Sequence, residues 1–236
     1  GDVYKRQVLC RALGLSSDEE ILNFFGEDER ILATLEKDTT KNQDEGLLEV
    51  YRKLRPGEPP TVESATNQIN MLFFDPRRYD LSRFGRYKMN KKLSLARRIT
   101  GFVAAENIVA PLTGEIIVEA KGKITRELAE KADAAGVDTV ILSIEGKKVK
   151  VITNGCVDAQ GFFSFDVKEC GINERCSFDE IKKILDTTSD VEEQKEMLRR
   201  NHDQLIGRTV TVKDILSSIN YLNGLGHGCL LYTSPS

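Results

Sequence analysis

The stretch Leu54-Arg55-Pro56-Gly57-Glu58-Pro59-Pro60-Thr61 separates two helices and so decides the local fold on both of its sides. Before it, Gln43–Leu54 carries apolar residues at helical spacing, which predicts a helix with one buried face. That helix must end here, because proline disfavours helical geometry in the preceding residue and a Pro-Pro pair keeps the backbone extended. Thr61 is a typical N-cap, so a second helix is predicted from there to Asp75-Pro76.

Capping residues predict further helices on both sides of this stretch. Ser17 and Glu20 have the spacing of a capping box, and Gly26 suits the exit of that helix. The same reasoning predicts a helix from Thr125 to Gly136. Later helices are predicted to begin at Ser177 and Thr211, and a charged helix is predicted over Val191–Asn201.

Short segments rich in Val and Ile, with Gly and Pro between them, predict a few strands in the middle of the chain. They are Phe102–Val109, Glu115–Glu119, Thr139–Ile144 and Lys148–Ile152. The order is therefore helical, then mixed, then helical again. This order predicts an α+β fold in which a mainly helical domain is interrupted by a smaller mixed α/β insertion.

The domain boundaries follow from these changes of pattern. We assign residues 8–98 and 208–228 to the helical domain and residues 99–207 to the insertion. Residues 1–7 and 229–236 fit neither pattern, so we interpret both as non-native ends.

Positive charge is concentrated in one stretch, although the formal net charge of the chain is only −3. Between Arg77 and Arg98 there are nine Lys or Arg residues and one acid, Asp80. Such a stretch can face phosphates, so we expect any DNA contact there. The candidate DNA-binding residues are Arg83, Arg86, Lys88, Lys91, Lys92, Arg97 and Arg98, of which Arg86, Lys88, Lys91 and Lys92 lead. The alternative is that these cations pair with the acidic stretch Asp18–Glu29 or with a sister subunit.

The sequence offers no recognisable catalytic or metal site. Its five cysteines include no CxxC pair, and it has only two histidines. Its carboxylates do not form the closely spaced Asp set that holds two magnesium ions for nucleotidyl transfer. No apolar run has the length of a membrane-spanning helix, and no secretory signal opens the chain. We therefore expect a cytoplasmic protein without membrane contact, without a cofactor of its own and without catalytic residues.

Several separate strings resemble the bacterial DNA-directed RNA polymerase β subunit. The first is the opening stretch, which is similar to the LRPGEPPT signature of that family. In the same order follow Leu72-Phe73-Phe74-Asp75-Pro76, then Gly85-Arg86-Tyr87-Lys88-Met89-Asn90-Lys91-Lys92-Leu93, then Asp214-Ile215-Leu216-Ser217-Ser218-Ile219-Asn220-Tyr221-Leu222. The resemblance covers residues 8–228 and corresponds to the lobe, one jaw of the cleft that holds downstream DNA.

The resemblance implies an internal fragment of a nucleotidyltransferase that is inactive alone. In the family, the whole enzyme carries out DNA-templated RNA synthesis with Mg²⁺ held by the β′ subunit. The implied partners are DNA and the β′, α and σ subunits. The alternative is a stand-alone nucleic-acid-binding or scaffold protein with a lobe-like fold, which should have its own initiator Met and its own final helix cap.

Overall fold

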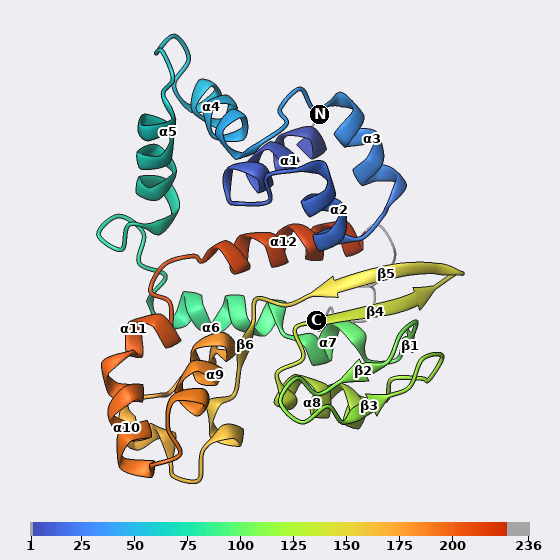
Figure 1. Cartoon of the computed structure of the whole chain (residues 1–236), viewed down its shortest axis with the longest axis vertical. Coiled ribbons are helices and arrows are strands. Elements are labelled where there is room, and N and C mark those ends of the chain that lie inside the picture. The colour runs from blue at the N-terminus through green and yellow to red at the C-terminus, as the bar shows by residue number, and fades with distance from the viewer. Residues whose placement is uncertain (1, 226–236) are drawn as a thin grey trace. The chain divides into compact units, whose positions relative to one another are not determined.

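A computed structural model describes residues 2–225 of the chain (Figure 1). The chain divides into two compact units, the first ending at Asp80 and the second beginning at Leu81. Helices hold 55% of the residues and strands hold 11%, which confirms the α+β class. Residues 229–236, interpreted above as a non-native end, lie outside the described part of the chain.

The first unit is entirely helical within its described residues. Its helices are α1 (Asp2–Ala12), α2 (Asp18–Phe25), α3 (Glu29–Lys37), α4 (Gln43–Leu54), α5 (Val62–Ile69) and the π-helical turn η1 (Asn70–Phe74). The predicted capping box of Ser17 with Glu20 is present at α2. Thr61 caps α5 with Ser64 as its partner, so the opening stretch separates α4 from α5 as predicted.

Three features of the first unit were not part of the sequence prediction. The helix after Thr61 becomes a π-helical turn at Asn70 before it ends. Helix α3 was not predicted, although Asp28 caps it and its buried residues Ile31 and Leu35 have i, i+4 spacing. Residues 2–7, which were set aside as part of a non-native end, belong to α1.

The first unit packs α1 closely against α4. Ala12, Leu47, Tyr51, Ala65 and Ile69 form its buried cluster. The close approach requires Gly46, because a Cβ there would lie 2.8 Å from Cβ of Arg11. Arg11 is itself fully buried, and its Nε donates to Asp38 Oδ2 at 2.8 Å while its Nη2 pairs with Asp18.

The second unit combines helices with three small antiparallel sheets. Its helices are α6 (Ser82–Leu93), α7 (Leu95–Ile99), α8 (Arg126–Ala135), α9 (Phe178–Thr187), α10 (Val191–Arg200), α11 (His202–Leu205) and α12 (Val212–Leu225), with 3₁₀ turns η2 (Ala159–Phe162) and η3 (Val167–Cys170). Its strands are β1 (Val103–Ala104), β2 (Ile108–Val109), β3 (Ile116–Val118), β4 (Thr139–Ile144), β5 (Lys147–Ile152), β6 (Cys156–Val157) and β7 (Cys176–Ser177). The sheets are β1-β4-β5, β2-β3 and β6-β7.

The strand prediction was right for three segments and wrong for the fourth. The hairpin of β4 and β5 has the predicted bounds to within one residue, and β3 lies inside its predicted segment. The segment Phe102–Val109 is not one strand, because β1 joins the β4-β5 sheet while β2 pairs with β3. A run of apolar residues cannot reveal such a change of sheet.

Two buried clusters stabilise the second unit. One joins α7 and α8 to the strands β1–β5, with Leu95, Ile99, Ile124 and Leu142 fully buried. The other joins residues 157–205 around Ile181, Ile184 and Leu198. Gly136 ends α8 at a φ of +89°, and a Cβ there would lie 2.5 Å from the Phe178 ring.

Helix α12 packs against two segments that lie far from it in the sequence. Thr211 and Asp214 form a reciprocal cap at its start, as the sequence predicted. The helix packs against α6 on one side and against β5 on another (Figure 1). Thus the last helix contacts both a segment assigned to the helical domain and a segment assigned to the insertion.

Candidate nucleic-acid interface

Helices α6 and α7 hold all seven predicted DNA-binding residues, and their helical period sorts these residues by burial. On α6 the buried residues are Arg86, Asn90 and Leu93, at the i, i+4, i+7 spacing of one helix face. On α7, Arg98 and Ile99 are buried and Arg97 is exposed. Leu81 fixes the start of α6, since its backbone N–H donates to the Arg208 carbonyl at 2.7 Å.

Arg86 is buried, so its expected role as a leading phosphate contact needs correction. Its Nη1 lies 3.0 Å from Oδ1 and 2.9 Å from Oδ2 of Asp214, with both side chains at most 3% exposed. Its Nε and Nη2 donate to the carbonyls of Gly207 and Thr209 at 2.9 and 2.6 Å. In this structure the guanidinium joins α6 to α12 and cannot reach an external phosphate.

A buried amide network extends the Arg86–Asp214 pair. Asn154 Nδ2 donates to Asp214 Oδ1 at 2.9 Å and to Asn90 Oδ1 at 3.0 Å. The backbone N–H of Thr211 also donates to Asp214, at 2.8 Å. The carboxylate therefore accepts from several donors, as a buried charge requires.

Arg98 is the second predicted site residue that is buried. Its Nη1 donates to the Ile152 carbonyl at 2.7 Å, and its Nη2 donates to Asn220 Oδ1 at 2.6 Å. Asn220 in turn donates to the Lys150 carbonyl at 2.8 Å. Arg98 thus links α7 to β5 and α12, and its charge does not face solvent.

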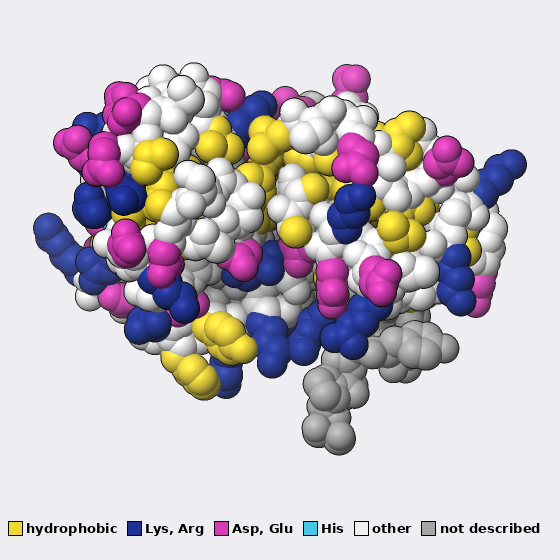
Figure 2. Space-filling view, turned by 90° about the horizontal axis from the view of Figure 1, so that it is seen from below, with side chains coloured by type: hydrophobic (Ala, Val, Ile, Leu, Met, Phe, Trp, Pro, Cys, Tyr) yellow, Lys and Arg dark blue, Asp and Glu magenta, His cyan; other side chains and the backbone are white. Residues whose placement is uncertain are grey.

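The other five candidates, Arg83, Lys88, Lys91, Lys92 and Arg97, are exposed. Arg83 pairs with Glu174 at 3.2 Å, with the arginine side chain 76% exposed. Within residues 2–225, Lys88, Lys91, Lys92 and Arg97 form no ion pair. Figure 2 shows basic and acidic side chains mixed over the face that it displays. Neither α6 nor α7 contains an acid of its own.

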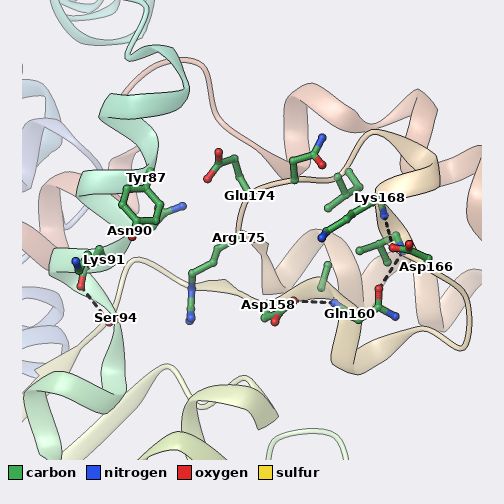
Figure 3. A pocket seen from close by; sticks show the side chains of 14 residues that line it. Tyr87, Asn90, Lys91, Ser94, Asp158, Gln160, Asp166, Lys168, Glu174 and Arg175 are labelled. Carbon is green, nitrogen blue, oxygen red and sulfur yellow. Dashed lines mark hydrogen bonds between the residues drawn. The ribbon is translucent and has the colours of Figure 1, made fainter.

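A cavity of ≈710 Å³ lies beside α6, within the second unit. Figure 3 shows Tyr87, Asn90 and Lys91 on the α6 side and Asp158, Glu174 and Arg175 on the facing segment. Its charged lining residues are Lys91, Lys168 and Arg175 against Asp158, Asp166 and Glu174. Because the two signs balance, the cavity does not favour phosphate in the way that the exposed side of α6 does.

Among the described residues there is no candidate metal centre, and the four cysteine thiols there are buried or half-buried. No group of three His, Cys, Asp or Glu among residues 2–225 could hold a metal ion. Burial raises the pKa of Cys10 and of Cys176 to about 12. Burial, together with the charge of Asp214, raises the pKa of Cys156 to about 11. These thiols stay protonated at neutral pH.

No helix of the described residues is long and apolar enough to span a membrane. Sequence reasoning missed the aromatic residues beside the exposed cations, Phe84 and Tyr87, which are 66% and 52% exposed. The signal was available, because Phe84 and Tyr87 share a helical face with Lys88 and Lys91. It also missed Asn90, Asn154 and Asp214, whose meeting no local spacing reveals.

Comparison with known proteins gives a consistent result over most of the chain. Residues 6–109 match the family described as RNA polymerase Rpb2, domain 2. The DNA-directed RNA polymerase subunit beta of Acetivibrio thermocellus is 54% identical over 94% of this chain, and that of Clostridium beijerinckii is 51% identical over 94%. The subunit from Clostridioides difficile is 50% identical over 91%. The chain spans about 18% of the length of these relatives.

Proposed function

The chain belongs to the family of the DNA-directed RNA polymerase β subunit, and on that premise we propose that it forms part of the wall of the downstream DNA cleft. In this role it acts within the whole nucleotidyltransferase, in contact with DNA and in assembly with the β′, α and σ subunits, in the cytoplasm. It supplies no catalytic residue. The Mg²⁺ of the reaction is held elsewhere, by the β′ subunit.

One observation carries the DNA part of this proposal. Five cations on α6 and α7 are exposed, and neither helix contains an acid. Phosphate contacts from such residues position DNA without reading its sequence, and they weaken steeply with salt. Arg86 and Arg98 are left out of this surface, because both guanidinium groups are used inside the fold.

The proposal also assigns roles to the parts of the chain. Residues 8–98 and 208–228 form the helical lobe, and residues 99–207 form a lineage-variable insertion. The buried contacts of Arg86 with Asp214 support this assignment, since they bring the two separated helical segments together. Helix α12 of the helical lobe also packs against β5 of the insertion.

The test uses a full-length β subunit that carries this segment, assembled into the enzyme. Lys88, Lys91 and Arg97 are replaced by Gln, and the lifetime of promoter open complexes is measured across a salt series. We expect shorter lifetimes and a salt slope reduced by about 0.9 per lost phosphate contact. The matched control replaces three exposed cations elsewhere, Lys147, Lys182 and Arg199, and should leave both quantities unchanged. An unchanged lifetime and slope in the first variant would refute DNA contact by these helices.

A further inference from the structure

The cavity beside α6 has a positive wall on the side of that helix. The residues that line this wall are Tyr87, Asn90, Lys91 and Ser94. Lys91 is the one charged side chain among these four, and it forms no ion pair within residues 2–225. The volume of the cavity, ≈710 Å³, falls in the range of about 300–1,000 Å³ that small-molecule sites occupy. The α6 side therefore presents a cation to a ligand of that size.

The facing wall of the cavity, from residues 158–175, is net negative. Two of its charges are neutralised locally, because Arg175 pairs with Asp133 at 2.5 Å and Glu174 pairs with Arg83 at 3.2 Å. The charged lining residues that remain are Lys168, Asp158 and Asp166. Both aspartates are exposed, and each caps a 3₁₀ turn with one carboxylate oxygen. One cation against two carboxylates leaves a negative wall opposite the positive one.

Asn90 adds an unused hydrogen-bond donor to the positive wall. Its Oδ1 accepts from Arg86 at 3.4 Å and from Asn154 at 3.0 Å. Because a guanidinium can only donate, these contacts fix the orientation of the amide, and Nδ2 points away from the buried network. Nδ2 is itself buried and has no hydrogen-bond partner among the described residues. An unpaired buried donor destabilises the folded chain until an acceptor reaches it.

The Tyr87 ring controls access to this donor. It lies beside Asn90 on the same wall of the cavity (Figure 3) and is 52% exposed. Exposed side chains change rotamer within nanoseconds, so the ring can turn and admit an acceptor to Nδ2. A carboxylate suits this point best, because it can accept from Nδ2 and pair with Lys91 at the same time. An uncharged carbonyl would leave the lysine without a counter-charge.

We propose that this cavity binds a zwitterion of short-peptide size, with its carboxylate at Asn90 and Lys91 and its ammonium group at Asp158 and Asp166. A simple anion would meet the two carboxylates of the facing wall, and a simple cation would leave Nδ2 unpaired. A ligand with both charges satisfies both walls, and the Tyr87 ring offers an apolar surface to its middle. This site adds to the DNA contact of the proposed function, because its ligand is neither DNA nor a phosphate.

Isothermal titration calorimetry of the full chain with tetra-alanine tests the two charges of the ligand. Acetylation of the amino end removes the positive charge of this peptide, and amidation of the carboxyl end removes the negative charge. Each block is expected to weaken binding at least about tenfold. Free alanine carries both charges but cannot reach both walls, so it should bind at least about tenfold more weakly than tetra-alanine. Equal binding of alanine and tetra-alanine would refute a ligand of peptide size.

Variants of the two walls locate the binding. Asn90→Asp replaces the donor by an acceptor of the same shape and should weaken tetra-alanine binding at least about tenfold. Asp158→Asn combined with Asp166→Asn removes the negative charge of the facing wall but keeps an oxygen for each cap. This double variant should weaken binding at least about fivefold. Asp186→Asn, at an exposed carboxylate outside the cavity, is the matched control and should leave binding unchanged.

Urea unfolding shows first whether Asn90→Asp is folded, since Asn90 also belongs to the buried network. If it is not, the double variant and the blocked peptides decide the outcome. An unaltered chain that does not bind tetra-alanine would overturn the proposal. So would equal binding of the free, acetylated and amidated peptides, or full affinity in the double variant.

Discussion

Both faces of α6 carry positive charge, but this charge is buried on one face and exposed to solvent on the other. On the inner face, Arg86 is buried against Asp214 and two backbone carbonyls. Two residues further along, on the opposite and outer face, Lys88 stands in solvent over the Phe84 ring. The difference teaches that a dense run of cations is not one functional unit. The helical period divides it, and the partner on each side decides what each charge does.

Removing the ion pair of Arg86 with Asp214 on the inner face of α6 should have the largest effect on stability. Arg86→Gln leaves the Asp214 carboxylate buried and without its cation, so we expect the free energy of unfolding to fall by about 3–5 kcal/mol. Urea unfolding of the full chain measures this. Replacing both partners with apolar residues, Arg86→Met with Asp214→Leu, should cost less than Arg86→Gln alone. A loss below about 1 kcal/mol for Arg86→Gln would contradict the buried assignment.

Adding a methyl group at Gly207, beside the Arg86 guanidinium, should have a smaller effect on the free energy of unfolding. A Cβ at Gly207 would lie 2.9 Å from Nη2 of Arg86 and 3.2 Å from the Thr209 carbonyl oxygen. Because the guanidinium is fixed by its other hydrogen bonds, it cannot move aside freely, and Gly207→Ala should destabilise by about 1–3 kcal/mol. Gly161→Ala, where a Cβ meets nothing within 4 Å, is the control in the same urea series. Equal midpoints for the two variants would show that the inner face tolerates the extra volume.

The thiol of Cys156, which senses the charges of Arg86 and Asp214, predicts that the free energy of unfolding depends on pH. Burial and the charge of Asp214 raise the pKa of Cys156 from 9.0 to about 11, so the folded chain holds this proton more tightly than the unfolded chain. The stabilisation that comes from this bound proton is therefore complete below pH 9. It is lost as the pH rises toward about 11, by at most about 1.4 kcal/mol per pH unit.

Urea unfolding of the unaltered chain and of Cys156→Ala over this pH range checks the contribution of the thiol. The alanine variant should show a shallower decline than the unaltered chain. Other groups that titrate in this range affect both proteins equally. Identical slopes for the two proteins would exclude Cys156 as a contributor.

The outer face should contribute least to stability. Lys88→Gln and Lys91→Gln remove exposed charges that form no ion pair within residues 2–225, so each should change the free energy of unfolding by less than about 0.5 kcal/mol. The same urea titration used for Arg86→Gln gives the comparison directly. A loss as large as that of Arg86→Gln would mean that the two faces do not differ in role.

The sequence alone determined the features that depend on neighbours a few residues away. The caps at Ser17, Thr61, Thr125 and Thr211 and the exit at Gly136 were predicted, because each depends on hydrogen bonds or backbone angles within one turn. The concentration of cations from Arg77 to Arg98 was equally visible.

Tertiary structure alone decided which of these cations remain exposed to solvent. Arg86 and Asp214 are 128 residues apart, and Arg98 and Asn220 are 122 residues apart, so no local pattern links either pair. The separation of β1 from β2 has the same origin, since each strand is defined by a partner elsewhere in the chain. Charge is a property of the residue, whereas its exposure depends on which distant segment packs against it.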